Sequence, residues 1–261
     1  MKLNIVPART GIQWVKLGVR TFLKQPLALT GLFFMYMAVV LVISQIPYLG
    51  SVAGAMLVPA ATLGLMAATA EAESGRFPMP TVLISAFRAG RQRARAMLVL
   101  GAIYTAGSMA ATLLGTLVAG QPPAPSPADA AGPQLDARML VVLLFHAPLV
   151  VLFWHAPALV HWHGISPVKS LFFSAVACLR NAGAMLMYGF AWLAVFMVVG
   201  FTISTIGLML GGTAVARSIM MPTVLLLVAM FTTSLYFTFR DSFRADDEEV
   251  VAAEPGGEET P

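Results

Sequence analysis

The sequence has little charge, a single cysteine and none of the common catalytic or metal-binding motifs. Only 11% of its 261 residues are charged and 58% are hydrophobic, whereas about 25% of residues are charged in soluble globular domains. A soluble protein with an ordinary surface is therefore excluded. The single cysteine, Cys178, excludes an intramolecular disulfide. We interpret it as a small apolar side chain that fills space rather than as a reactive thiol.

The few charges are gathered in short windows, which leaves long apolar windows between them. A window of about 20 residues, at 1.5 Å per residue, is long enough to cross the roughly 30 Å hydrocarbon core of a bilayer. Six windows qualify, and the predicted spans are about 27–46, 51–70, 97–119, 139–162, 184–209 and 219–239. The expected fold class is therefore all-α: a polytopic membrane protein with a single transmembrane domain over residues 1–240.

The connections between these windows predict how the spans are paired. Residues 45–50 and the Gly211-Gly212 pair are short turns, so each should join two antiparallel spans. Residues 120–137 are rich in proline and small residues, which predicts a flexible external loop. Residues 241–261 are acidic and end in proline and glycine, which predicts a disordered cytoplasmic tail.

An amphipathic segment precedes each pair of spans. In residues 9–24, basic and apolar side chains recur at helical spacing, which is typical of a helix lying in the membrane interface. Trp14 suits the headgroup level of such a helix. Residues 80–97 and 167–185 carry similar stripes and are weakly alike in sequence. These features favour three helical hairpins, each preceded by a cytoplasmic amphipathic interfacial helix.

The basic residues predict the orientation of the chain. With six spans, fourteen of the sixteen lysines and arginines fall on one side, and only Arg138 and Arg217 fall on the other. Because cytoplasmic loops carry the excess of Lys and Arg, both termini should be cytoplasmic. The net charge of +4 follows from these residues, so we expect no binding of nucleic acid.

A dense basic cluster stands immediately before the third span. It consists of Arg88, Arg91, Arg93 and Arg95, and Lys169 lies in the third amphipathic segment. Such a cluster either determines topology or contacts anionic lipid headgroups. Membrane lipid is therefore the expected partner, and no protein partner can be identified from the sequence.

Polar residues within the predicted spans form a second set of candidates. An ionisable side chain at membrane depth usually faces the bundle interior and is a candidate for function, although it can also be a neutral histidine bonded to a neighbouring helix. The candidates for an intramembrane polar site are His146, His155 and Gln45. His161 and His163 flank Trp162 where a span meets water, and we interpret them as interfacial residues.

No residue pattern points to an enzyme. The spans contain no carboxylate, and the sequence lacks G-x-S-x-G, H-x-x-x-H, C-x-x-C and a glycine-rich phosphate loop. We therefore predict no catalytic residue, no metal and no cofactor.

The first hypothesis for the function is a non-enzymatic scaffold or accessory component at the cytoplasmic leaflet. The alternative is a transporter or channel for a small molecule or lipid, lined by the polar candidates and by kinks at Pro59, Pro148 and Pro157. An enzyme acting on lipid has the least support.

Two motifs carry a resemblance to a known family. They are H-A-P-x-L-V-x-x-H-G-x-S-P-x-K-S-L-F-F-S-x-V-A-C-L-R-N at 155–181 and V-P-A-R-x-G-x-x-W-x-x-x-G at 6–18. With these motifs the chain resembles an uncharacterised family of proteobacterial multi-pass inner-membrane proteins. The layout is also loosely similar to the membrane domain fused to some glycerophosphodiester phosphodiesterases, but this sequence contains no catalytic domain of that kind. The resemblance implies the fold and a location in the bacterial inner membrane, and it implies no activity.

Overall fold

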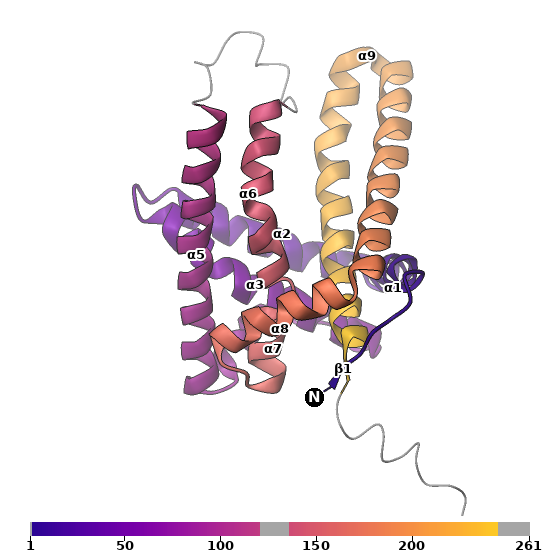
Figure 1. The fold of residues 1–261 in the computed structure, drawn as a ribbon. Helices are drawn as coiled ribbons and strands as arrows, with labels where there is room; N and C mark the ends of the chain where they lie inside the picture. Colours follow the sequence, from indigo (N-terminus) through magenta and orange to yellow (C-terminus); the bar gives the residue numbers. More distant parts are fainter. Residues whose placement is uncertain (1, 121–135, 245–261) are drawn as a thin grey trace, which may run out of the picture. The chain divides into compact units, whose positions relative to one another are not determined.

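The computed structural model describes residues 2–120 and 136–244, and nearly all of them are helical (Figure 1). The helices are α1 (Thr10–Lys24), α2 (Pro26–Ser44), α3 (Gly50–Glu73), the 3-10 helix η1 (Pro80–Ile84), α4 (Ser85–Arg88), α5 (Arg91–Ala119), α6 (Ala137–Phe153), α7 (Ala156–His163), α8 (Pro167–Arg180) and α9 (Ala182–Ser242). Two short antiparallel strands, β1 (Lys2–Leu3) and β2 (Phe243–Arg244), pair with each other. Most of the predicted external loop and of the predicted tail lies outside the described residues.

Five helical stretches are long and apolar enough to cross a membrane. They are Pro26–Ser44, Gly50–Glu73, Arg91–Ala119, Ala137–His163 and Ala182–Ser242. Large apolar side chains such as Leu144 and Phe201 are exposed on them, as expected of helices whose outer faces contact lipid. The prediction of an all-α, multi-pass membrane protein is confirmed.

The longest of these stretches, α9, has 61 residues but is not one straight helix. Gly211 and Gly212 leave the helical conformation, and Gly212 has a φ of 73°, which a residue with a Cβ rarely adopts. The chain reverses there, where the sequence predicts a turn, and Figure 1 shows the two limbs side by side. Ser234 connects the limbs, because its Oγ is 2.6 Å from the Tyr188 hydroxyl and accepts a bond from Trp192 Nε1 at 3.1 Å.

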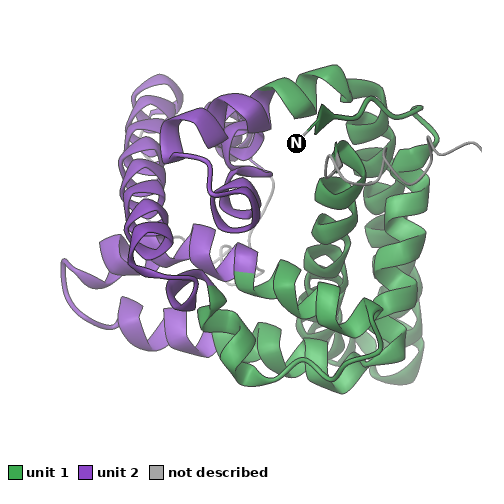
Figure 2. Cartoon of the chain, turned by 90° about the horizontal axis from the view of Figure 1, so that it is seen from below, with its two compact units in different colours: residues 1–36, 64–85, 176–261 green, residues 37–63, 86–175 purple. Residues whose placement is uncertain are grey.

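The chain forms two compact units, which Figure 2 shows in different colours. Among the described residues, unit 1 contains 2–36, 64–85 and 176–244, and unit 2 contains 37–63, 86–120 and 136–175.

In unit 1, helix α1 packs directly against α9. Gly11 and Gly18 make this close approach possible: a Cβ on Gly11 would lie 2.6 Å from the Tyr188 amide nitrogen, and one on Gly18 would lie 2.7 Å from Ser234 Cα. Trp14 lies between these glycines on the same face and is fully buried. The Trp14 side chain therefore packs against α9 and does not face lipid headgroups, because the two glycines bring its face of α1 into contact with α9.

Unit 2 is built around a small apolar core. The core consists of Ala60, Leu63, Ala86, Met97, Leu100, Phe153, Ala156 and Val160, which come from α3 to α7. Helix α6 packs on the ridge of small residues along α5, since Gly107 faces Leu149 and Gly115 faces Val142. The sequence indicates this ridge by its four-residue spacing of glycine and alanine.

Candidate functional site

Four arginines project from a bend in unit 2, which we name the basic corner: Arg88, Arg91, Arg93 and Arg95. Arg88 ends the single-turn helix α4, and Gly90, with a φ of 99°, turns the chain into α5. Arg91 is the first residue of α5, so three of the four guanidinium groups belong to the first turns of a membrane-spanning helix. All four side chains are exposed.

The charge of the basic corner is not balanced locally. The N-terminus of a helix carries a partial positive charge, which favours acidic residues in the first turn and disfavours basic ones. The first turn of α5 contains no acidic residue. Within residues 2–120 and 136–244, no aspartate or glutamate forms an ion pair with any of the four arginines. The corner is therefore an electropositive surface that is open to an anion.

Lys169, the fifth basic candidate, lies on the exposed face of α8. Its neighbours on that face are apolar, with Val168 70% exposed and Phe172 64% exposed. The serines of the helix, Ser170 and Ser174, point the other way and are fully buried. An outward apolar face beside a cation is typical of a helix at the membrane surface.

His155, one of the intramembrane candidates, lies at a break between α6 and α7. In an unbroken helix, its backbone N–H would donate to the carbonyl of Val151. Instead, the Ser174 hydroxyl stands between them: it accepts from the His155 N–H at 3.0 Å and donates to the Val151 carbonyl at 2.9 Å. The His155 side chain is fully buried. An inserted side chain is one of the recognised causes of a helix kink, and Pro157, which lacks an N–H, follows it.

The other two intramembrane candidates make separate contacts. His146 is half-buried in α6, and its ring Nδ1 is 2.9 Å from the Val142 carbonyl of the same helix. Gln45 is exposed in the turn that follows α2, where its side-chain amide donates to the Leu41 carbonyl at 3.4 Å. No hydrogen bond within the described part of the chain joins any two of His146, His155 and Gln45.

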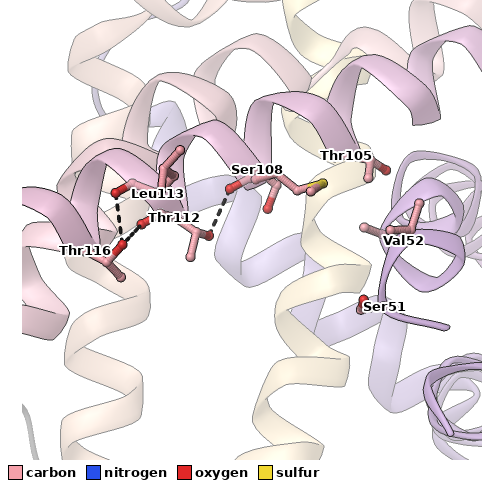
Figure 3. A pocket seen from close by; sticks show the side chains of 9 residues that line it. Ser51, Val52, Thr105, Ser108, Thr112, Leu113 and Thr116 are labelled. Carbon is pink, nitrogen blue, oxygen red and sulfur yellow. Dashed lines mark hydrogen bonds between the residues drawn. The ribbon is translucent and has the colours of Figure 1, made fainter. Parts of the chain in front are cut away.

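Unit 2 also has an open groove of about 460 Å³ between α3 and α5 (Figure 3). Its lining consists of Ser51, Val52, Ala55, Thr105, Ser108, Met109, Thr112, Leu113 and Thr116. The threonine hydroxyls donate to carbonyls of their own helix, as from Thr105 to Gly101 at 2.9 Å and from Thr112 to Ser108 at 2.9 Å. None of the predicted polar candidates lines this groove.

Unit 1 also contains a polar cluster that was not predicted from the sequence. Arg240 donates to Glu73 at 2.7 Å and to Asp241 at 2.9 Å, and the indole of Trp14 donates to the second Asp241 oxygen at 2.9 Å. Residues 241–244, which the sequence assigned to the acidic tail, belong to α9 and β2. The one available signal was the position of Asp241, which directly follows a basic residue at the end of a span.

The two sequence motifs that suggested a family meet in unit 1. Asn181, the last residue of one motif, accepts from the amide of Val6, the first residue of the other, at 2.9 Å. The Asn181 side chain also donates to the Asn4 carbonyl at 3.1 Å. A buried asparagine thus fixes the N-terminal strand to the start of α9.

Comparison with known proteins places the chain in a family. No family model matches it, and no solved structure matches it. A probable inner membrane protein of Burkholderia thailandensis is 34% identical over 257 residues, which cover 93% of this chain and 94% of the relative. The looser similarity to the membrane domain of glycerophosphodiester phosphodiesterases gains no support from these comparisons. At this identity and coverage, the chain belongs to the same family of bacterial inner-membrane proteins as its Burkholderia relative.

Proposed function

We propose that this inner-membrane protein is a non-enzymatic scaffold or accessory component that acts at the cytoplasmic leaflet and contacts anionic lipid headgroups there. The basic corner and Lys169 make the contact. The observation that carries the proposal is that these five basic side chains are exposed, and no acidic residue in the described part of the chain pairs with them. A juxtamembrane Lys or Arg near an anionic surface contributes about 1 kcal/mol of attraction.

The surroundings of the basic corner suit a lipid better than a free anion. Exposed apolar side chains flank it, including Phe87 on α4 and Leu98 and Val99 on α5. The planar guanidinium groups can bind a phosphate through two parallel hydrogen bonds. A phospholipid would thus meet charge at its headgroup and apolar surface along its chains.

The proposal includes the finer topology: six spans in three hairpins, with both termini in the cytoplasm. The glycine turn in α9 supports it, because each limb exceeds the roughly 20 residues that cross a bilayer core. A reporter fused after Pro261, or inserted in the connection 74–79, should then signal from the cytoplasm. A periplasmic signal from either position would contradict this orientation.

Native mass spectrometry of the protein in a gentle detergent tests the lipid contact. We expect the wild-type protein to retain anionic phospholipids in preference to zwitterionic ones. The variant Arg91→Gln/Arg93→Gln/Arg95→Gln should lose most of them, because it removes three of the five cationic contacts. The control Arg138→Gln/Arg217→Gln removes the two basic residues of the opposite predicted side and should retain them. Equal retention by both variants would refute the proposal.

A transporter or channel for a small molecule or lipid is the second candidate function. The break at His155 favours it, because interrupted helices line the substrate sites of many transporters. The same mass spectra distinguish the two functions. A defined small molecule that co-purifies with the protein, and that His146→Ala abolishes while the triple arginine variant retains it, would favour transport.

A further inference from the structure

Helix α1 and its N-cap residue, Arg9, carry a second basic surface, which we name the α1 stripe: Arg9, Lys16, Arg20 and Lys24. At 100° per residue, these four positions fall within about 80° around the helix axis. All four side chains are exposed. The opposite side of the helix, with Gly11, Trp14 and Gly18, is buried against α9. The stripe therefore faces away from the packing of unit 1.

The acidic residues in the described part of unit 1 do not neutralise this stripe. They are Glu71, Glu73 and Asp241. Glu73 and Asp241 are bound by Arg240, and Asp241 also accepts from Trp14. None of the three forms an ion pair with a stripe residue within residues 2–120 and 136–244.

The chain itself carries a complementary segment. Residues 245–261, which lie outside the described residues, contain seven acidic side chains and no basic one. The acidic residues are Asp246, Asp247, Glu248, Glu249, Glu254, Glu258 and Glu259.

The described chain ends beside α1, because Asp241, shortly before β2, accepts a hydrogen bond from Trp14 of that helix. The acidic segment follows β2, which pairs with β1, and β1 leads into α1 within the same unit. Seventeen residues can reach roughly 55 Å when fully extended, whereas the fifteen-residue helix α1 is only about 22 Å long. The whole stripe is therefore within reach.

We propose that the acidic segment 245–261 docks on the α1 stripe. Two observations favour it over an external partner. The charges are opposite, and the covalent link raises the effective concentration of the segment to the millimolar range, at which weak ion pairs become occupied. The proposal does not depend on the basic corner, because α1 and β2 belong to unit 1 and the corner belongs to unit 2.

Carbodiimide cross-linking of the full chain in nanodiscs of zwitterionic lipid tests this docking, because it joins lysine to carboxylate without a spacer. Lys16 and Lys24 lie on the stripe, and Lys169, exposed on α8, is the internal control. We expect peptides that join Lys16 or Lys24 to residues 246–259, at about fivefold the yield of those from Lys169. Raising the salt from about 0.1 M to 1 M should remove this excess, because the Debye length falls from about 10 Å to 3 Å.

A matched pair of variants makes the test specific. Arg9→Gln/Arg20→Gln keeps both reactive lysines and removes half of the stripe charge, so the yield at Lys16 and Lys24 should fall about threefold. Gln13→Ala, a neutral change on the same face, should leave the yield unchanged. Equal yields at Lys16, Lys24 and Lys169, or a yield that salt does not change, would overturn the proposal. Loss of the cross-links in nanodiscs of anionic lipid would also overturn it, because it would identify lipid as the occupant.

Discussion

Two basic segments that look alike in the sequence, residues 9–24 and 80–95, have different structures. The first is one helix, α1, whose charges stand opposite a face buried on α9. The second is divided into η1, α4 and the start of α5, and its charges project from a bend at Gly90. The packed face of α1 should therefore contribute to stability, whereas the open basic corner should contribute to binding.

The largest effect is expected at the packed glycine of α1. In Gly18→Ala, the new Cβ would lie 2.7 Å from Ser234 Cα, so α1 and α9 would have to separate. Overpacking of this kind typically costs about 1–3 kcal/mol. Thermal unfolding in detergent should show a clearly lower midpoint. Gly31→Ala is the control, because nothing lies within 4 Å of its added Cβ; equal midpoints for the two variants would contradict the packing.

A smaller effect is expected from the buried indole of α1. Trp14→Phe keeps an aromatic ring but removes the N–H that donates to Asp241 at 2.9 Å. A hydrogen bond to a charged group contributes about 2 kcal/mol to the free energy of unfolding. In a double-mutant cycle with Asp241→Asn, the loss caused by Trp14→Phe should be smaller when the carboxylate has already been replaced. Strictly additive losses would show that the two side chains are not coupled.

The inserted serine of unit 2 should have a still smaller effect. Ser174→Ala removes the hydroxyl between the His155 amide and the Val151 carbonyl. We expect a loss of about 1 kcal/mol, because these two backbone groups can partly recover by pairing with each other. Ser170→Ala is the control: Ser170 is equally buried on the same helix, but its hydroxyl donates only to Pro167 nearby. If both variants lose the same free energy of unfolding, the insertion is not a stabilising contact.

The main elements of the fold are readable from the sequence because the bilayer imposes their length and polarity. The six apolar windows fall on the five helical stretches that are long and apolar enough to cross a membrane. Gly211-Gly212 marks the reversal in α9, because only glycine readily adopts a φ of 73°. The lipid-contact candidates are equally visible, since four arginines within eight residues stand out in a chain with 11% charge.

The remaining features depend on tertiary contacts, which the periodicity of apolar and polar residues in the sequence does not reveal. Trp14 has the sequence context of an interfacial residue, and only the approach of α1 to α9 buries it. Ser174 belongs to α8, but its hydroxyl interrupts the helical hydrogen bonds between α6 and α7. It does so at His155, which lies nineteen residues earlier in the chain. Asn181 meets Val6 across 175 residues of sequence. In each case the deciding partner is distant in the chain.

Stabilisation by lipid tests the central claim most directly. A ligand that binds only the folded protein raises the free energy of unfolding by RT ln(1 + [L]/Kd). The unfolding midpoint of the wild-type protein should therefore rise as an anionic phospholipid is added to the detergent. Without lipid, Arg91→Gln/Arg93→Gln/Arg95→Gln should unfold at or slightly above the wild-type midpoint, because it removes positive charge from the N-terminus of α5. With lipid it should lose most of the rise, while Arg138→Gln/Arg217→Gln keeps it. An undiminished rise in the triple arginine variant would contradict the assignment of the basic corner as the lipid-contact site.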